Sequence, residues 1–188
     1  MKKLQRDPFW NSTTIGCDAA LVPWLHDHGS LTKRIQQHCD QFSVSPVRSG
    51  LARIAYDESA LLSIAPQQLA YSREVFLYAD GKPVVFAHST CAIQHLRGVW
   101  AAIAGLGNQS LGTMLFTHPL VERRQLRFKA LCHYHPLYQS ASSKGQLPPR
   151  LWARRSLFYL HNAPLLVTEV FLQGILKLNR EAHGTGYR

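Results

Sequence analysis

The residue whose type and position most strongly suggest chemistry is Glu169. It stands in the segment 165–172, Leu-Leu-Val-Thr-Glu-Val-Phe-Leu, which predicts a strand that is apolar on both faces. Glu169 is also the only acidic residue between Glu122 and Glu181. Because an isolated buried carboxylate is costly, we expect Glu169 to have either a basic partner or a task in catalysis or binding.

Arg73 is the second residue that interrupts an apolar pattern. Alternation along the predicted strand 71–78 places it on the face shared by Val75 and Leu77, so its guanidinium should point inward. The planar fork of an arginine matches a carboxylate. That carboxylate could belong to a ligand, or Arg73 and Glu169 could form a purely structural pair, and the pattern by itself leaves both alternatives open.

Two predicted helix starts add backbone donors to this set. Ser30 and Ser110 are suitable N-caps, so helices should begin at Leu31 and Leu111. The first N–H groups of a helix lack partners within the helix and attract anions. These amides carry little weight alone, and their value lies in combination with Arg73.

The elements that must position these residues form an α+β pattern. Asp80-Gly81 between two β-rich segments predicts a hairpin, and Pro46 indicates an edge strand or a bulge. Helical spacing of apolar residues predicts a further helix that is capped by Ser89 or Thr90 and ends near Gly105. The expected strands cover 42–47, 71–78, 83–89, 121–128, 155–160 and 165–172.

We therefore expect one α+β domain over residues 1–188, with an antiparallel sheet and helices packed on one face. A chain of 188 residues with 46% hydrophobic content can bury one core. The polar segment 132–149 contains Ser, Gly and Pro and is expected to be a loop excursion from this domain.

Composition limits the partners and the compartment. The net charge is +10, which suits a polyanion or a small dianion, but the chain contains no nucleic-acid-binding motif. Neither a signal peptide nor a transmembrane segment is evident, and the four scattered cysteines suit a reducing compartment. These features predict a cytoplasmic protein with no stable nucleic-acid partner. The cluster Cys132-His133-Tyr134-His135 lacks a second pair of metal ligands, so no metal site is expected.

Six segments, in order along the chain, resemble the bacterial chorismate pyruvate-lyase family of ubiquinone biosynthesis. The resemblance extends over about residues 30–172. It is carried by Ser30-Leu31-Thr32-Lys33-Arg34, by 43–50, by Arg73-Glu74 with Ala79-Asp80-Gly81, by Leu111-Gly112 with Leu115-Phe116-Thr117, by Leu151-Trp152 with Arg154-Arg155-Ser156, and by 164–172.

This resemblance implies a lyase that converts chorismate to 4-hydroxybenzoate and pyruvate, the first committed step of ubiquinone biosynthesis. It implies an enclosed internal ligand site and no metal or organic cofactor. We expect a monomer. By the resemblance, Arg73 holds the ring carboxylate with help from the backbone amides of Leu31 and Leu111. Glu169 meets the hydroxyl at the opposite end of the ring, and Arg73 and Glu169 are the candidate catalytic residues.

Chorismate carries a second carboxylate on its enolpyruvyl group, and this group needs a cation. The sequence offers four candidates, which are Lys33, Arg34, Arg154 and Arg155. Two other functions stay open at this level. One is a non-catalytic module of the same fold that binds a small aromatic ligand, and the other is a basic nucleic-acid-binding protein, which steep salt dependence of binding would reveal.

Overall fold

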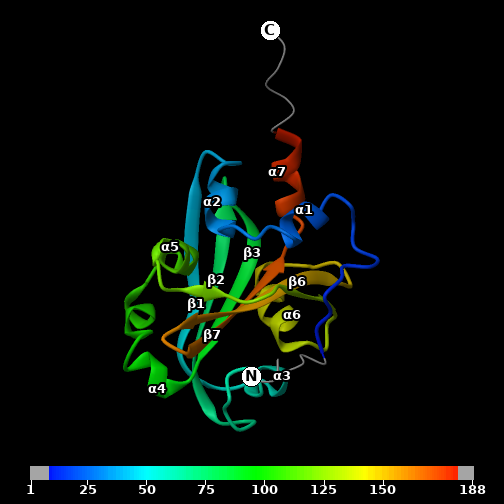
Figure 1. The fold of residues 1–188 in the computed structure, drawn as a ribbon. Coiled ribbons are helices and arrows are strands. Elements are labelled where there is room, and N and C mark those ends of the chain that lie inside the picture. The colour runs from blue at the N-terminus through cyan, green and yellow to red at the C-terminus, as the bar shows by residue number, and fades with distance from the viewer. Residues whose placement is uncertain (1–8, 182–188) are drawn as a thin grey trace.

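The computed structural model describes residues 9–181 as one antiparallel sheet covered by short helices (Figure 1). The sheet has seven strands in the order β1-β2-β3-β7-β6-β4, and β5 also pairs with β6. The sheet is strongly twisted, because β1 to β3 stand upright in Figure 1 whereas β6 lies across the view. The strands are β1 (Phe42–Arg53), β2 (Leu69–Ala79), β3 (Lys82–Cys91), β4 (Glu122–Arg123), β5 (Arg127–Leu131), β6 (Leu151–Leu160) and β7 (Ala163–Phe171).

Two tight hairpins bring the central strands together. Asp80 and Gly81, between β2 and β3, have φ angles of 48° and 74°, and His161 and Asn162, between β6 and β7, have 47° and 64°. Positive φ at both central residues is the feature of the two-residue turn that matches strand twist. The hairpin predicted at Asp80-Gly81 and the pairing of the last two strands are therefore confirmed.

The first strand is an edge strand, as Pro46 predicted. Its pairing with β2 shifts register between Pro46 and Arg48, which marks a bulge. Proline lacks the N–H that a central strand would need, so the edge and the bulge together accommodate it. The strand continues to Arg53, well beyond the predicted 42–47.

Helices lie on both faces of the sheet, whereas the sequence predicted one face. Helices α1, α2 and α7 pack with Val75 and Val85 on one face, and η1 and α5 complete that side. Helix α6 packs on the other face against Phe76, and Ile54, Leu61 and Leu62, which flank α3, pack there against Leu166. The helical segments are α1 (Val22–Leu25), α2 (Leu31–Gln36), α3 (Tyr56–Ser59), α4 (Ile93–Leu96), η1 (Ala101–Gly105), α5 (Leu111–Thr117), α6 (Pro136–Ala141), η2 (Ser142–Lys144) and α7 (Ile175–Glu181).

Segment 132–149 is not the predicted loop excursion. It forms α6 and η2, and Leu137, Tyr138 and Ala141 are buried against the second face of the sheet. The Tyr138 hydroxyl donates to the carbonyl of Pro148 at 2.7 Å and fastens the return of the chain. The apolar side chains of this face, Phe86 among them, need a cover, and the segment supplies it.

The helix predicted up to Gly105 is broken. Ser89 and Thr90 stay in β3, where Ser89 lies between Arg73 of β2 and Val167 of β7. At these two residues, the backbone hydrogen bonds that β3 forms with β2 and β7 are more favourable than a single helix-capping hydrogen bond. The remainder becomes α4 and η1, while the predicted strand 121–128 divides into β4 and β5. No helix in residues 9–181 combines the length and apolarity that a membrane span requires.

Candidate active site

A cavity lies between the sheet and the two helices α2 and α5, on the face that carries α1 and α7. The space between these elements is about 580 Å³ when it is measured out to open solvent, and residues from six strands line it. The strands contribute Val75, Ala87 and Val167 as an apolar floor. The helices contribute Leu31 and Leu111 as part of the cover.

Arg73 and Glu169 both line this cavity. Alternation along its strand predicted that Arg73 points inward, and a strand that is apolar on both faces predicted the same of Glu169. Arg73 pairs across the sheet with Ser89, whereas Glu169 pairs with Ala87, so the two residues lie on β2 and β7 with β3 between them. Their strands are therefore about 10 Å apart. No ion pair joins their side chains among the residues that the structure describes, so the purely structural pair is absent.

Arg73 is buried without a counter-charge. Its side chain donates to the carbonyls of Gly107 and Gln109 at 3.0 and 2.8 Å, and the residue is 3% exposed. Within residues 9–181 no carboxylate lies at ion-pair distance from it. Burial lowers the pKa of Arg73 below its ordinary value, with a small opposing effect from Tyr71. A guanidinium in this state is prepared to bind a carboxylate from outside the protein.

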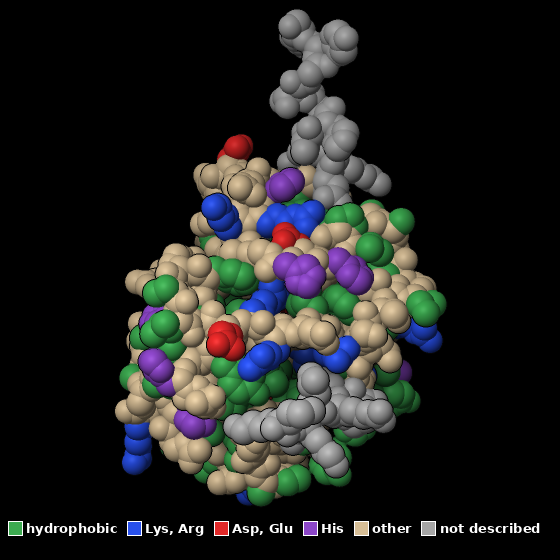
Figure 2. All heavy atoms as spheres, in the orientation of Figure 1, with side chains coloured by type: hydrophobic (Ala, Val, Ile, Leu, Met, Phe, Trp, Pro, Cys, Tyr) green, Lys and Arg blue, Asp and Glu red, His purple; other side chains and the backbone are tan. Residues whose placement is uncertain are grey.

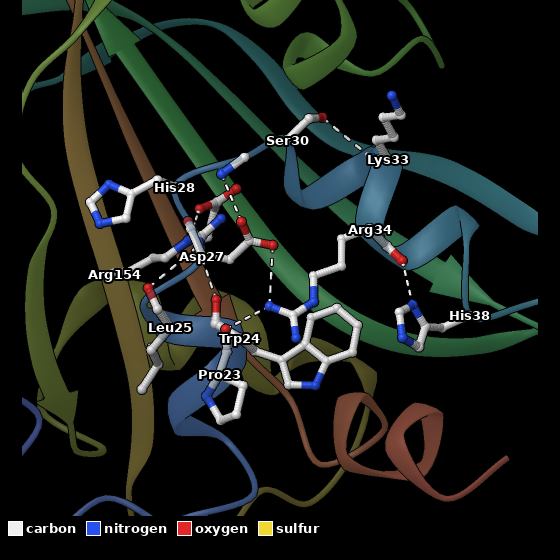
Figure 3. A network of polar contacts seen from close by, with 12 residues as sticks. Pro23, Trp24, Leu25, Asp27, His28, Ser30, Lys33, Arg34, His38 and Arg154 are labelled. Carbon is white, nitrogen blue, oxygen red and sulfur yellow. Dashed lines mark hydrogen bonds and ion pairs between the residues drawn. The ribbon is translucent and has the colours of Figure 1, made fainter. Parts of the chain in front are cut away.

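Glu169 has a basic partner, which is one of the two alternatives that its sequence context predicted. The Nε of Arg154 donates to its Oε2 at 2.5 Å, across the pairing of β6 and β7. Arg154 is fully buried, and its Nη1 also donates to three carbonyls at the end of α1, those of Trp24, Leu25 and Asp27 (Figure 3). Arg154 therefore fixes the position of Glu169 and ties it to the chain that leads into α2.

The starts of α2 and α5 meet at the cavity. The Ser30 side chain caps α2 by accepting from the backbone N–H of Lys33 at 3.3 Å, as predicted. Ser110 precedes α5 without such a cap, and its hydroxyl instead contacts that of Thr32 at 2.6 Å. A Cβ on Gly112 would meet the Thr32 hydroxyl oxygen at 2.9 Å, so this glycine permits the close approach of the two helices.

The backbone amides of Leu31 and Leu111 occupy the first positions of these two helices. Both residues are buried, with 2% and 6% exposure, and both line the cavity. Among the described residues, neither amide donates to another group. A buried N–H is normally satisfied, so these two donors suit an acceptor that the ligand supplies.

Three of the four cations predicted for a second carboxylate are not brought to the cavity. Lys33 is exposed on α2, and Arg34 forms an ion pair with Asp27 at 3.1 Å (Figure 3). Arg155 points to the opposite face of the sheet, where its Nη1 donates to Asp57 at 2.8 Å. Adjacent strand residues face opposite sides, which separates Arg155 from its neighbour in the sequence. The fourth candidate is the partner of Glu169 described above.

The structure brings a different cation to the cavity, Arg123 of β4. Its Nε donates to the hydroxyl of Ser156 at 2.9 Å, and its Nη1 donates to the carbonyl of His28 at 3.0 Å. Burial lowers the pKa of Arg123 to about 10, against the opposing effect of Glu169. The sequence carried one signal for this residue. Alternation in 121–128 places it on the face of Val121, which packs against the core.

Basic side chains are visible across the middle of the face shown in Figure 2, with histidines above them. Further basic side chains lie near the edges of this face, and the full chain has a net charge of +10. A concentration of positive charge near a cavity raises the local concentration of anions and their rate of entry. This distribution favours a negatively charged ligand.

A row of charged and polar residues supports the sheet from the face opposite the cavity. Glu74, His88, Thr168 and Arg155 are cross-strand neighbours on β2, β3, β7 and β6. His88 lies 3.3 Å from Glu58 of α3 and 3.2 Å from Glu74. Burial alone would lower the pKa of His88, but these two carboxylates outweigh it and raise the pKa to about 10. His88 is therefore a buried cation that holds β2 and β3 to α3.

A comparison with models of protein families shows to which family this chain belongs. Residues 4–180 match the family model described as chorismate lyase. The chain belongs to the chorismate lyase family. This confirms the resemblance that six segments carried in the sequence. Arg73, Glu169, Leu31 and Leu111, to which that resemblance assigned ligand binding, all line the cavity, and their roles in binding stay a prediction.

Relatives of this chorismate lyase family member cover most of its length. A protein of Nitrosospira multiformis is 54% identical over 157 residues, which are 82% of this chain and 87% of that protein. A protein of Nitrosomonas europaea is 47% identical over 170 residues, 90% of this chain and 96% of that protein. Both carry the name "Probable chorismate pyruvate-lyase".

Solved structures with very different sequences have a fold similar to that of this family member. The effector domain of PhnF from Mycobacterium smegmatis superposes with a TM-score of 0.55 at 12% identity, covering 78% of this chain and 90% of that chain. A second structure, the PhnF C-terminal domain, gives a TM-score of 0.55 at 14% identity, over 69% and 82% of the two chains. At such low identity the likeness confirms the α+β antiparallel fold and carries no assignment of function.

The Cys/His cluster of the sequence plays structural roles in this chorismate lyase family member. The side chain of His135 accepts from the backbone N–H of Leu137 and caps α6. His133 contacts the ring of Tyr134, and Cys132 has a free thiol. Within residues 9–181 no group of three His, Cys, Asp or Glu side chains is arranged to hold a metal ion.

Proposed function

We propose that this protein removes pyruvate from chorismate and leaves 4-hydroxybenzoate. One observation carries the proposal. Arg73 and Glu169 line one cavity and form no ion pair with each other, so an anionic group and a hydroxyl group of one ligand can each find a partner. Membership of the chorismate lyase family and the names of its relatives support the same activity.

The substrate itself supplies much of the driving force. Chorismate is a cyclohexadiene with a carboxylate at C1, an enolpyruvyl ether at C3 and a hydroxyl at C4. Loss of the C4 hydrogen and cleavage of the bond between C3 and the ether oxygen make the ring aromatic. The protein mainly needs to hold the side chain in a reactive geometry and to stabilise the charge that develops at the ether.

In the proposed complex, Arg73 binds the ring carboxylate at one end of the cavity. The backbone amides of Leu31 and Leu111 point to the same ligand and donate to its oxygens. Glu169 accepts a hydrogen bond from the C4 hydroxyl at the opposite end. Arg154 keeps the Glu169 carboxylate in place, so it is a positioning residue with no contact to the substrate.

Two proton routes balance the reaction. In the first, the C4 hydrogen passes to the enolpyruvyl methylene through a six-membered ring while the C3–O bond breaks and the pyruvate carbonyl forms. In the second, Glu169 takes the C4 proton and the methylene gains a proton in a separate step. All atoms of both products come from chorismate, so neither route consumes an oxidant or any other reactant.

We further propose that the reaction is the first committed step of ubiquinone biosynthesis, carried out in the cytoplasm by a monomer. The resemblance to the bacterial family supports the pathway. The four cysteines, which are all free thiols, suit a reducing compartment. Because the C4 hydroxyl and the ring carboxylate persist in the product, 4-hydroxybenzoate should inhibit the enzyme.

Mixing the purified protein with chorismate and following both products tests the proposal. Pyruvate and 4-hydroxybenzoate should appear in equal amounts, at a rate proportional to enzyme concentration. The solved structures with this fold include an effector domain, so a non-catalytic binding module is the alternative. Binding of 4-hydroxybenzoate without release of pyruvate would favour that alternative and refute the lyase.

A further inference from the structure

The cavity contains a second arginine whose task the contacts within the protein leave open. Arg123 lines the cavity from β4, and its guanidinium lies 5.5 Å from the ring centroid of Phe116 and 5.3 Å from that of Phe158. The two rings restrict its direction. Hydrogen bonds to Ser156 and to the carbonyls of His28 and Gly29 use Nε and Nη1.

The second terminal nitrogen of Arg123, Nη2, has no hydrogen-bond acceptor among the described residues. The guanidinium also has no carboxylate within ion-pair distance in residues 9–181. Its sequence neighbour Arg124 differs, because it is exposed and forms an ion pair with Glu122 at 3.5 Å. Arg123 is thus a cation that is fixed at the cavity wall and whose Nη2 donors remain available to a ligand.

Arg123 lies on the opposite side of the cavity from Arg73. Its anchor, Ser156, belongs to the cross-strand row Arg73–Ser89–Val167–Ser156, which runs from β2 to β6. Three strand spacings separate the ends of that row, or about 14 Å. Glu169 is the carboxylate that acts most strongly on the charge of Arg123, so Arg123 lies near the Glu169 end.

This arrangement matches the charges of chorismate. The enolpyruvyl ether is attached at C3, next to the C4 hydroxyl that Glu169 is proposed to bind. A ligand with its ring carboxylate on Arg73 therefore carries its second carboxylate toward the Glu169 end. The product retains only the ring carboxylate, so it has no second anionic group that a cation at the Glu169 end could bind.

We propose that Arg123 binds the enolpyruvyl carboxylate of chorismate and thereby distinguishes the dianionic substrate from the monoanionic product. This inference rests on the proposed function. Arg123 holds the side chain that leaves as pyruvate, in the geometry that places its methylene near C4. It takes the role that the sequence offered to Lys33, Arg34, Arg154 and Arg155.

The test compares Arg123→Met and Arg123→Lys with the matched control Arg124→Met. For each protein, kcat and KM are measured on chorismate, and the inhibition constant is measured for 4-hydroxybenzoate. We expect Arg123→Met to lower kcat/KM by roughly 100-fold, the effect of losing a charge-assisted pair of hydrogen bonds, and to change the product constant less than about threefold. Arg123→Lys should recover part of the loss, and Arg124→Met should match the wild type.

Two results would overturn the assignment. One is an Arg123→Met protein with kcat/KM near the wild-type value. The other is a loss of substrate and product affinity by the same factor, which a purely structural role would produce. If the Met variant does not fold, the Lys variant decides, because a structural role predicts equal losses for the two ligands. A wild type that releases no pyruvate refutes the lyase itself, whereas an active wild type with an indifferent Arg123 refutes only this inference.

Discussion

Replacing Arg73 with Met should leave the ligand-free protein as stable as the wild type, or more stable, while binding is lost. The wild type buries the Arg73 guanidinium to 3% exposure with no carboxylate beside it in the described part of the chain. Desolvation of an ion inside a protein costs several kcal/mol even after relaxation. That cost disappears in the Met variant.

The opposing loss is small. Two hydrogen bonds to the carbonyls of Gly107 and Gln109 disappear, each contributing about 1.5 kcal/mol net because the donor is charged. Both residues are exposed, so water can replace the lost donor. The expected free energy of unfolding is therefore unchanged or higher by about 1–2 kcal/mol. Loss of a bidentate contact to a carboxylate weakens binding by about 3 kcal/mol, on the order of 100-fold.

Denaturant unfolding with and without 4-hydroxybenzoate measures both effects. The ligand should raise the unfolding midpoint of the wild type but not that of Arg73→Met, and KM for chorismate should rise by a similar factor. Arg97→Met, at an exposed position after α4, is the matched control and should behave as the wild type. An Arg73→Met protein that is clearly destabilised yet binds the product normally would show that Arg73 is a structural residue and refute the reasoning.

Further predictions follow from the other contacts. Glu169→Gln keeps an acceptor for Arg154 but loses the charge, so kcat for pyruvate release should fall at least about 100-fold, and the melting temperature should also fall because Arg154 stays buried without a counter-charge; a folded variant with normal turnover would exclude the role of Glu169. His88 has a pKa near 10, above its ordinary 6.5, so its stabilisation is complete below pH 6.5 and is lost as the pH rises toward 10. Unfolding titrations of His88→Gln should lack this decline, and an identical pH profile would contradict the assignment. Gly112→Ala forces its Cβ against the hydroxyl of Thr32, so product affinity should fall, whereas Gly105→Ala, with open space around its Cβ, is the control; equal affinities in the two variants would show that the helix contact does not shape the site.

Much of the site could be predicted because it depends on local patterns. Alternation along a strand fixes the face to which a side chain points, and this was enough to direct Arg73 inward, whereas Glu169 was expected inside because its strand is apolar on both faces. The hairpin at Asp80-Gly81 followed from turn chemistry, and the start of α2 followed from its Ser30 cap. Each of these inferences needs only a few consecutive residues.

The failures share a different cause. The helix expected from Ser89 or Thr90 to Gly105 does not begin at these two residues. Their backbone groups pair with β2 and β7 instead, so both residues stay in β3. Segment 132–149 is polar along most of its length, yet it packs a helix on the second face because that face must be covered. Both outcomes depend on elements that are distant in the sequence.

The sequence by itself determined the family, the antiparallel α+β architecture and the inward direction of Arg73 and Glu169. Only the tertiary structure decided the partners of those residues. In the folded protein Arg154 pairs with Glu169, and Arg155 points to the other face of the sheet, where it pairs with Asp57. In the described part of the chain Arg123, and none of the predicted cations in its place, lines the cavity as a free cation. The physical reason is that a strand's own pattern sets the face of each side chain, whereas its neighbours come from strands that only the sheet order brings together.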